Sequence, residues 1–255
     1  VISALRAIEA RSPHMAHKAR QYVGAIIREA CRTGKRDEHR ILDLRDTLTK
    51  LPDSHFKTFD EKDLPGFIKA LEQYKGAPQT RIALKLLMHL FVRPSEMAGA
   101  RWSEFDLKAA QWHIPASRMK MKREHLVPLS KQAIALLEEL RSLTGAFPFL
   151  FPGERAPHSQ HMARDTFSKA MRSMGYQGKA TPHGFRAMAS TMLNEMGFDP
   201  DVIEYQLAHK EPNKIRAAYN RAQYVQKRAA MMRAWSDFLE GTTKGNIVPF
   251  RKPAA

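Results

Sequence analysis

The sequence predicts a mainly α-helical protein with one small antiparallel β-sheet. Three observations lead to this prediction. Apolar residues recur at helical spacing along most of the chain, and proline or glycine residues separate these stretches. Two short stretches, residues 111–114 and 125–129, are instead typical of strands and lie on either side of a basic turn. With 255 residues, of which 43% are hydrophobic, the chain can bury a substantial core.

Proline and glycine residues set the boundaries of the expected helices. Pro94 suits the first turn of a new helix after a break at Arg93. Thr181 is expected to cap a helix whose first residue is Pro182, and a helix that starts at Pro200 repeats this arrangement. The other expected helices cover residues 60–74, 80–92, 94–100, 131–143, 161–174 and 225–239, and the helix after Thr181 is expected to end at residue 197.

Changes in this pattern divide the chain into four parts. Residues 1–50 have a helical pattern that breaks near Pro52, so residues 51–57 are expected to be a linker. Residues 58–240 form the main unit, and the weakly patterned residues 241–255 are expected to be a flexible C-terminal tail. Because the chain opens at Val1 within a helical pattern, we expect that an N-terminal part of the natural protein is absent.

The chain is strongly basic, with 42 Lys and Arg residues against 26 Asp and Glu residues and a net charge of +16. Such a surface attracts polyanions, and the phosphate backbones of nucleic acids come first. A membrane surface is the second option, but the sequence has no long uncharged apolar run and no amphipathic terminal anchor. Cys31 is the only cysteine, which excludes a disulfide within the chain and fits a reducing cytoplasm.

Two short stretches combine side chains that suit an anion. Arg93 lies at a helix break with Glu96 three residues later, and a helix junction can hold a guanidinium rigidly. A purely structural arginine is the alternative. His183 and Arg186 lie three residues apart in the first turn of an expected helix, where free N–H groups favour a phosphate or carboxylate. The alternative there is a solvated helix start.

Two further stretches are notable for their positive charge. The turn at residues 118–123 contains Lys120 and Lys122, one of which can reach a phosphate or donate a proton; the alternative is a hairpin tip that contacts only solvent. In the stretch 207–222, His209 and Tyr219 lie ten residues apart among several cationic residues. These cationic residues are Lys210, Lys214, Arg216 and Arg221.

This set of side chains matches phosphodiester transfer through a covalent enzyme intermediate. Two guanidiniums can hold the non-bridging phosphate oxygens, and a lysine can protonate the departing 5′ oxygen. A tyrosine that faces cations can act as the nucleophile. Such a reaction needs no metal and no other cofactor. Other chemistries are less well supported, because the sequence contains no Gly-rich phosphate loop, no HExxH motif and no GxSxG motif.

The order of these residues, R…K…HxxR…H…Y, resembles that of the tyrosine recombinases, also called the phage integrase family. The blocks that carry the resemblance are ARWSEFDL, RMKMKREHLVPLS, HGFRAMASTMLNEMG and QLAHKEPNKIRAAYNRA. They are similar to the subgroup found in prophages and genomic islands related to satellite phage P4. The resemblance covers residues 58–240 and implies the catalytic-core fold of that family, while residues 1–50 resemble the later part of its helical core-binding domain.

The resemblance also implies roles for individual residues. Arg93 and Arg186 would clamp the scissile phosphate, Glu96 would support the site, and Tyr219 would be the nucleophile. The residues expected to contact DNA around this site are Lys122, Arg123, Lys210, Lys214, Arg216 and Arg221.

The general acid and the two histidines follow from the same resemblance. Lys120 would be the general acid when the register is set at the Val-Pro-Leu sequence of residues 127–129, and a two-residue shift would give this role to Lys122. His183 would assist proton transfer at the tyrosine. His209 would donate a hydrogen bond to the phosphate.

The function that the resemblance implies is site-specific recombination of DNA through a 3′-phosphotyrosine intermediate, for the integration or excision of a prophage or genomic island. The expected partners are double-stranded DNA attachment sites, other protomers in a DNA-assembled tetramer, and DNA-bending accessory proteins. The expected location is the cytoplasm, in association with the nucleoid. The alternatives are a type IB topoisomerase and a non-catalytic DNA-binding protein, which the basic charge alone allows.

Overall fold

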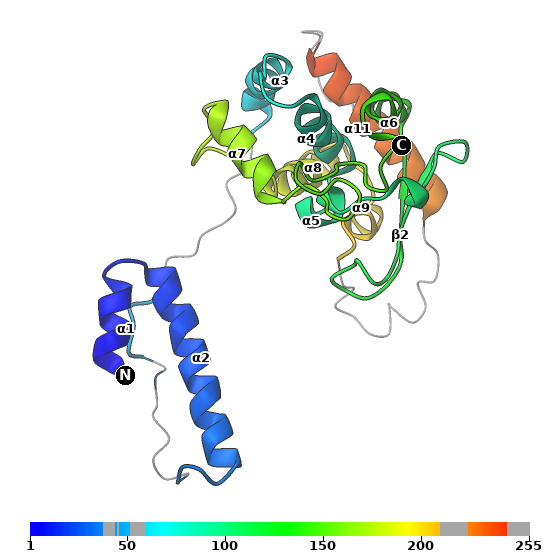
Figure 1. The fold of residues 1–255 in the computed structure, drawn as a ribbon. Coiled ribbons are helices and arrows are strands. Elements are labelled where there is room, and N and C mark those ends of the chain that lie inside the picture. Colours follow the sequence, from blue (N-terminus) through cyan, green and yellow to red (C-terminus); the bar gives the residue numbers. More distant parts are fainter. Residues whose placement is uncertain (38–43, 45, 52–59, 210–223, 244–255) are drawn as a thin grey trace. The chain divides into compact units, whose positions relative to one another are not determined.

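The structure is a computed structural model that describes residues 1–37, 44, 46–51, 60–209 and 224–243. The chain divides into two compact units, Val1–His55 and Phe56–Ala255, both drawn in Figure 1. In the described ranges, no helix is both long enough and apolar enough to cross a membrane.

The smaller unit consists of two packed helices and the segments that follow them. These helices are α1 (Ile2–Glu9) and α2 (Pro13–Arg32). Leu5 and Ala16 are buried together with Leu44 and Leu48. Two residues beyond α2, Gly34 takes a left-handed conformation (φ 69°), which suits a helix end. The helical pattern is therefore confirmed as far as the end of α2. The described residues between 33 and 51 are not helical, so the prediction of helix up to residue 50 was wrong.

The larger unit is mainly helical, with a three-stranded sheet in its described residues. Its helical elements are η2 (Glu61–Asp63), α3 (Leu64–Glu72), α4 (Pro78–Leu90), α5 (Pro94–Ala98), η3 (Trp102–Glu104), α6 (Lys131–Thr144), α7 (Asp165–Ser173), α8 (Gly184–Glu195), α9 (Pro200–Gln206) and α11 (Val225–Thr243). Its strands are β1 (Phe105–Asp106), β2 (Gln111–Ile114) and β3 (His125–Pro128). The predicted fold class, mainly α with a small antiparallel sheet, is confirmed.

Helix α4 is the centre of the larger unit. It contacts α3, α5, α6, α7, α8 and α11, and Figure 1 shows it among these helices. Ile82, Leu86 and Leu90 are buried on it, as the sequence predicts for a core stripe. Trp235 of α11 is also fully buried, and its Nε1 donates to the carbonyl oxygen of Met88 at 2.9 Å. The core therefore includes α11, although this helix lies far from α4 in the sequence.

The sheet is antiparallel and has the strand order β1–β2–β3. Trp112 in the central strand pairs with Phe105 on one side and Val127 on the other, and its side chain is fully buried. Strands β2 and β3 confirm the two expected strands, with β3 ending at Pro128. Strand β1 was not expected, because two residues are too few to show the alternating pattern of a strand.

Several helices of the larger unit have boundaries that differ from the expected ones: α3 starts at Leu64 rather than at residue 60, and α5 ends at Ala98 rather than at residue 100. Two other differences have a specific cause. Helix α4 ends at Leu90, two residues earlier than expected, because Phe91 takes a left-handed conformation with φ 36°. Helix α7 starts at Asp165 rather than at residue 161, because His161 pairs with Pro152 in an isolated β-bridge. The first difference comes from a backbone conformation and the second from a contact with a distant residue, and the spacing of apolar residues predicts neither.

Two further boundaries correct the sequence prediction. Helix α8 begins at Gly184 rather than at Pro182, because the Gly184 amide donates to the carbonyl (2.8 Å) and the hydroxyl (3.1 Å) of Thr181, and these bonds close a turn before the helix. Helix α11 continues to Thr243, so the expected tail does not begin at residue 241. Residues 244–255, and residues 52–59 of the expected linker, lie outside the described residues.

Arg228 joins α11 to two other elements of the larger unit. Its side chain is fully buried, and its Nε and Nη2 donate to Oε1 of Gln206 at 3.0 and 2.7 Å. Nη2 also donates to the carbonyl oxygen of Leu126. Because Gln206 belongs to α9 and Leu126 to β3, one buried cation holds three elements together.

Replacing Arg228 with methionine should lower the free energy of unfolding by about 3 kcal/mol, because two buried acceptors then lose their donor. Urea unfolding followed by tryptophan fluorescence measures this change, since all three tryptophans lie in the larger unit. Lys227→Met is the matched control, because the Lys227 side chain is 66% exposed, and it should change stability by less than about 0.5 kcal/mol. Equal losses in the two variants would contradict the prediction.

Candidate active site

Arg93 is held at the junction between α4 and α5. Its Nη1 lies 2.9 Å from Oε1 of Glu96, and its backbone amide donates to Oε2 of the same carboxylate at 2.9 Å. The Glu96 side chain is only 3% exposed, so this ion pair is largely shielded from water. The expected helix break at Arg93 and the new helix from Pro94 are confirmed. The first turn of α5 places the Glu96 carboxylate where it can accept from both the backbone amide and the guanidinium of Arg93.

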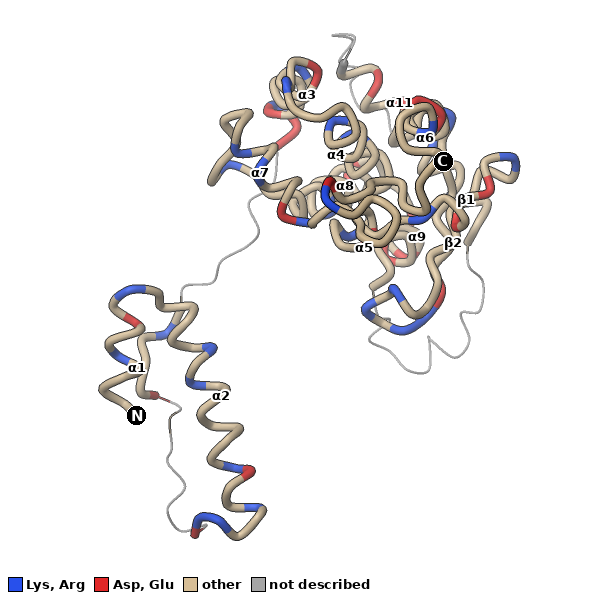
Figure 2. The backbone as a smooth tube through the Cα atoms, in the orientation of Figure 1, with Lys and Arg blue, Asp and Glu red and all other residues tan. Residues whose placement is uncertain are grey.

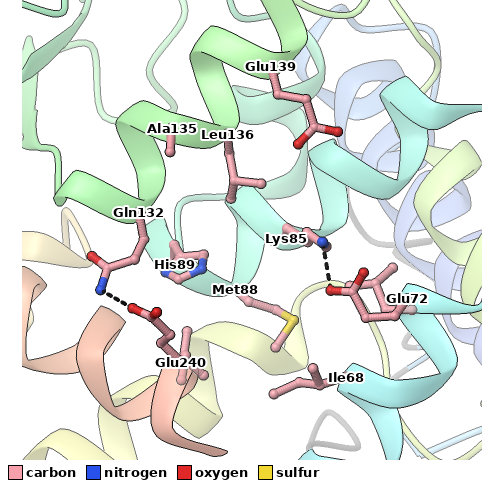
Figure 3. Close-up of a pocket in the computed structure, with 12 residues that line it drawn as sticks. Ile68, Glu72, Lys85, Met88, His89, Gln132, Ala135, Leu136, Glu139 and Glu240 are labelled. Carbon is pink, nitrogen blue, oxygen red and sulfur yellow. Dashed lines mark hydrogen bonds and ion pairs between the residues drawn. The ribbon is translucent and has the colours of Figure 1, made fainter. Parts of the chain in front are cut away.

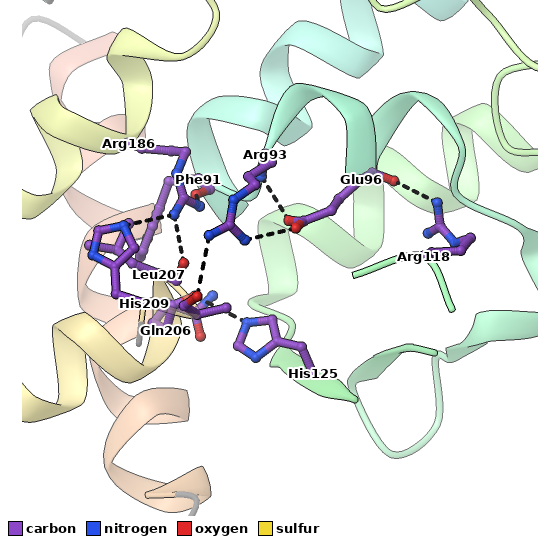
Figure 4. Close-up of polar contacts among 10 residues, drawn as sticks. Phe91, Arg93, Glu96, Arg118, His125, Arg186, Gln206, Leu207 and His209 are labelled. Atoms are coloured by element: carbon purple, nitrogen blue, oxygen red, sulfur yellow. Dashed lines mark hydrogen bonds and ion pairs between the residues drawn. The ribbon is translucent and has the colours of Figure 1, made fainter. Parts of the chain in front are cut away.

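Arg186 of α8 lies beside Arg93 and is buried. Its Nη1 donates to the carbonyl oxygen of Phe91 at 2.8 Å, and its Nη2 donates to that of Leu207 at 2.6 Å. Arg93 Nη2 donates to the next carbonyl along the chain, that of Ala208, at 3.2 Å. The two guanidiniums therefore meet at the end of α9 (Figure 4).

The end of α9 offers these carbonyls because of how the helix closes. Ala208 is left-handed with φ 50°, and the amide of His209 donates to the carbonyl of Glu204 at 3.2 Å. This is the arrangement of a Schellman motif, in which the last carbonyls of a helix turn outward. The C-terminal end of a helix also attracts positive charge. Both effects favour two cations at this position.

His209 completes a chain of polar contacts with Arg186. Its Nε2 lies 3.3 Å from Nη2 of Arg186, and its Nδ1 lies 2.7 Å from Oε2 of Glu204. A guanidinium can only donate, so Nε2 is the acceptor and the proton of the neutral ring is on Nδ1, which donates to Glu204. Glu204 thereby orients the imidazole so that Nε2 faces the two arginines.

His183 precedes α8 and is half-buried. Burial lowers the pKa of its imidazole, and electrostatic repulsion from Arg186, Arg93, His209 and Lys120 lowers the pKa further. These groups act on one ring because the structure brings all of them into one region. A neutral His183 at neutral pH is suited to accept a proton.

The basic loop between β2 and β3 carries the two candidate lysines. Lys120, Lys122 and Arg123 are all exposed, and Figure 2 shows a concentration of Lys and Arg along this loop. Lys122 is left-handed with φ 53° and lies in the turn, two residues beyond Lys120. Of the two lysines, Lys120 is the one whose charge acts on His183.

The structure thus brings together six of the residues proposed from the sequence. They are Arg93, Glu96, Lys120, His183, Arg186 and His209. The remaining proposed residues of the stretch 207–222 lie outside the described residues. These are Lys210, Lys214, Arg216, Tyr219 and Arg221.

Two further polar side chains of this region were not found from the sequence. Glu204 contacts His209, and no motif marks a glutamate five residues before a histidine. His125 at the start of β3 is buried, and its Nε2 lies 3.1 Å from the carbonyl oxygen of Gln206. Burial, reinforced by the charge of Arg228, lowers the pKa of His125 to about 3. The sequence shows only a histidine at a strand end, which is commonly a surface position.

A cavity of about 400 Å³ lies away from these residues, between α3, α4, α6 and α11 (Figure 3). Lys85 pairs with Glu72 at 2.7 Å on its wall, and Gln132 donates to Glu240 at 3.0 Å. None of the six assembled site residues lines this cavity. Its mixed apolar and charged wall does not resemble a phosphate site, so we place the candidate chemistry at the arginines.

Comparison with known proteins agrees with this geometry. Residues 57–226 match the model of the phage integrase family, which is more than half of the chain. The chain belongs to the phage integrase family. The expected resemblance is therefore confirmed at the level of the family.

Curated integrases are similar to the chain over almost its whole length. The integrase of Enterobacteria phage P4 is 37% identical over 257 residues, which cover 94% of this chain and 58% of that protein. Prophage integrase IntA of Escherichia coli (strain K12) is 35% identical over 249 residues, which cover 97% of this chain and 60% of that protein. This integrase-family chain therefore spans about three fifths of the length of these relatives.

Solved structures share the fold at lower identity. A lambda integrase (75–356) dimer bound to a COC′ core site matches with a TM-score of 0.63 and 17% identity, over 82% of this chain and 78% of that chain. The Tn1549 transposon integrase in complex with circular intermediate DNA matches with a TM-score of 0.59 and 14% identity, over 90% of this chain and 83% of that chain. The tyrosine recombinase catalytic-core fold expected from the sequence is confirmed.

The stability of this integrase-family chain should fall as the pH drops from 6.5 to 5. Burial lowers the pKa of His89 to about 4 and that of His125 to about 3, whereas histidines of the unfolded chain titrate near 6.5. The unfolded state therefore binds more protons in this window, so the free energy of unfolding decreases, by about 2 kcal/mol for each histidine at pH 5.

Urea unfolding at pH 7 and pH 5 measures this loss. His89→Gln should remove about 2 kcal/mol of the pH-dependent loss, since the variant has no group to protonate at that position. His113→Gln is the matched control, because His113 is exposed, and should keep the pH dependence of the unaltered protein. If the two variants show the same pH dependence, the buried state of His89 does not cause the effect.

Proposed function

We propose that this chain is the core-binding and catalytic part of a site-specific DNA recombinase that cleaves and rejoins DNA through a 3′-phosphotyrosine intermediate. Its role would be the integration or excision of a prophage or genomic island. The observation that carries this proposal is the convergence of Arg93 and Arg186 on the adjacent carbonyls of Leu207 and Ala208, next to His209. Two fixed guanidiniums at one point are what a scissile phosphodiester requires.

The arginines suit the non-bridging oxygens of the phosphate. In the free protein, Arg93 pairs with the Glu96 carboxylate and also donates to the neutral carbonyl of Ala208. Arg186 donates to the carbonyls of Phe91 and Leu207 and contacts His209, and none of its partners in the described residues is a carboxylate. A phosphate oxygen is a stronger acceptor than a carbonyl because it is charged. Charge that develops on these oxygens in the transition state would then be stabilised by groups that are already in position, at about 3–4 kcal/mol for each donor.

The bond changes of the cleavage step can be assigned to residues. The phenol oxygen of Tyr219 attacks phosphorus while the bond from phosphorus to the 5′ oxygen breaks. His183 accepts the phenol proton, and Lys120 gives a proton to the departing 5′ oxygen. His209 donates a hydrogen bond to the phosphate, and the carboxylate of Glu204, which lies 2.7 Å from its Nδ1, orients the ring. Attack by a 5′-hydroxyl of another strand reverses these steps and completes the exchange.

The partners belong to the same proposal. Lambda integrase has been solved as a dimer bound to a core site and as a tetramer bound to a Holliday junction, which supports DNA and further protomers as partners here. The smaller unit would be the later part of the core-binding domain, with residues 51–57 as the linker. DNA-bending accessory proteins would direct the assembly, and the protein would act at the nucleoid in the cytoplasm.

The first test concerns the nucleophile. Tyr219→Phe should bind attachment-site DNA with nearly unchanged affinity but form no covalent adduct on a nicked suicide substrate, because only the phenol oxygen can be esterified. Gel mobility measures binding, and a denaturing gel measures the adduct. Tyr224→Phe is the matched control and should still form the adduct. A covalent adduct with Tyr219→Phe would assign the nucleophile to another residue.

A second test distinguishes the two lysines of the basic loop. Lys120→Ala should slow cleavage by about 10²–10⁴-fold on a substrate with the ordinary 5′-bridging oxygen. On a substrate with a 5′-bridging sulfur, the variant should cleave nearly as fast as the unaltered protein, because a thiolate leaves without a proton. Lys122→Ala should show no such rescue. The reverse pattern would give the role of general acid to Lys122.

A further inference from the structure

An ion pair at the base of the basic loop is not explained by the proposed chemistry. Arg118 Nε donates to Oε1 of Glu104 at 2.8 Å, and Nη2 donates to Oε2 at 2.8 Å. The side chains are only 19% and 7% exposed, so the pair is largely buried. A two-point contact between planar groups fixes both the position and the orientation of the guanidinium.

Both partners of this pair are held by further contacts. Oε2 of Glu104 also accepts a hydrogen bond from Nε1 of the buried Trp112 at 3.0 Å, which attaches the carboxylate to the centre of the sheet. On the other side, Nη1 of Arg118 donates to the carbonyl oxygen of Glu96 at 3.2 Å, as Figure 4 shows. Arg118 therefore links the loop that carries Lys120 to the residue whose side chain holds Arg93.

The end of α5 leaves space for this contact. A Cβ atom added to Gly99 would lie only 2.8 Å from Nη1 of Arg118. The φ of Gly99 is −92°, which any residue can adopt, so the glycine is needed here for space rather than for its backbone conformation. Next to Arg118, Met119 is 2% exposed and anchors the loop in the core, whereas Lys120 and the residues up to 124 are exposed. The fixed part of the loop thus ends immediately before Lys120.

We propose that Arg118, clamped by Glu104 and the Glu96 carbonyl, is a positioning residue that sets where Lys120 lies relative to the arginine clamp. The inference rests on the proposed function, since it assumes that Lys120 delivers the proton to the 5′ oxygen. Glu96 is the shared reference point: its carboxylate holds Arg93, and its carbonyl holds the loop of the general acid. Arg118 itself touches no reacting atom.

The test compares cleavage of two suicide substrates, one with a 5′-bridging oxygen and one with a 5′-bridging sulfur. Arg118→Met should slow cleavage of the oxygen substrate by about 10²-fold, because the general acid is misplaced. The sulfur substrate needs no general acid, so its cleavage should change by less than about threefold. A residue that only supports the fold would slow both substrates equally.

Further variants separate positioning from stability. Arg118→Met leaves the Glu104 carboxylate buried without its cation, so the double variant Arg118→Met/Glu104→Gln removes that unpaired charge. The double variant should regain thermal stability but keep the selective defect on the oxygen substrate. Gly99→Ala, which pushes against the guanidinium, should show a weaker defect of the same kind. Arg172→Met is the matched control on the exposed surface of α7 and should cleave both substrates at the normal rate.

Each outcome has a defined meaning when Lys120→Ala is measured in parallel. If sulfur rescues Lys120→Ala but not Arg118→Met or the double variant, the positioning role is overturned and the proposed function stands. If sulfur does not rescue Lys120→Ala, the assignment of the acid fails and the positioning role fails with it. Selective rescue of Lys120→Ala, Arg118→Met and the double variant supports the proposal.

Discussion

The rest of this site depends on two guanidinium groups being held side by side. Two like charges in a partly buried place repel each other, so neighbouring groups must compensate for that repulsion. Here the carboxylate of Glu96 pairs with Arg93, and the outward carbonyls at the end of α9 accept from both arginines. The left-handed Phe91 turns its own carbonyl to Arg186. The junction between α4 and α5, the start of α8 and the end of α9 all serve this one arrangement.

Because the compensating groups are mostly neutral, the free site is prepared for an anion. Arg186 keeps its charge at neutral pH even though burial, with the repulsion of Arg93, lowers its pKa to about 10. The same positive surroundings, added to burial, lower the pKa of His183 and keep its imidazole neutral. A bound phosphate would relieve the repulsion between the arginines. One cluster of charges can therefore provide both a permanent clamp and a proton acceptor.

The site is also a meeting point of distant elements. Arg228 attaches α11 to α9 and β3, and Arg118 attaches the basic loop to α5. The first contact fixes the element that follows the segment containing Tyr219, and the second fixes the loop containing Lys120. The proposed reacting groups need such anchors, because a misplacement of about 1 Å can cost about a hundredfold in rate.

The sequence by itself determined the fold class, the break at Arg93, strands β2 and β3, and the spacing of His183 and Arg186. Local periodicity, proline positions and short motifs encode these features. Only the tertiary structure decided which groups Arg186 contacts, since its partners Phe91 and Leu207 lie 95 and 21 residues away. The left-handed Phe91 and the later start of α8 likewise depend on packing and on turn hydrogen bonds. A contact between two distant residues leaves no period in the sequence, so it appears only when the chain is folded.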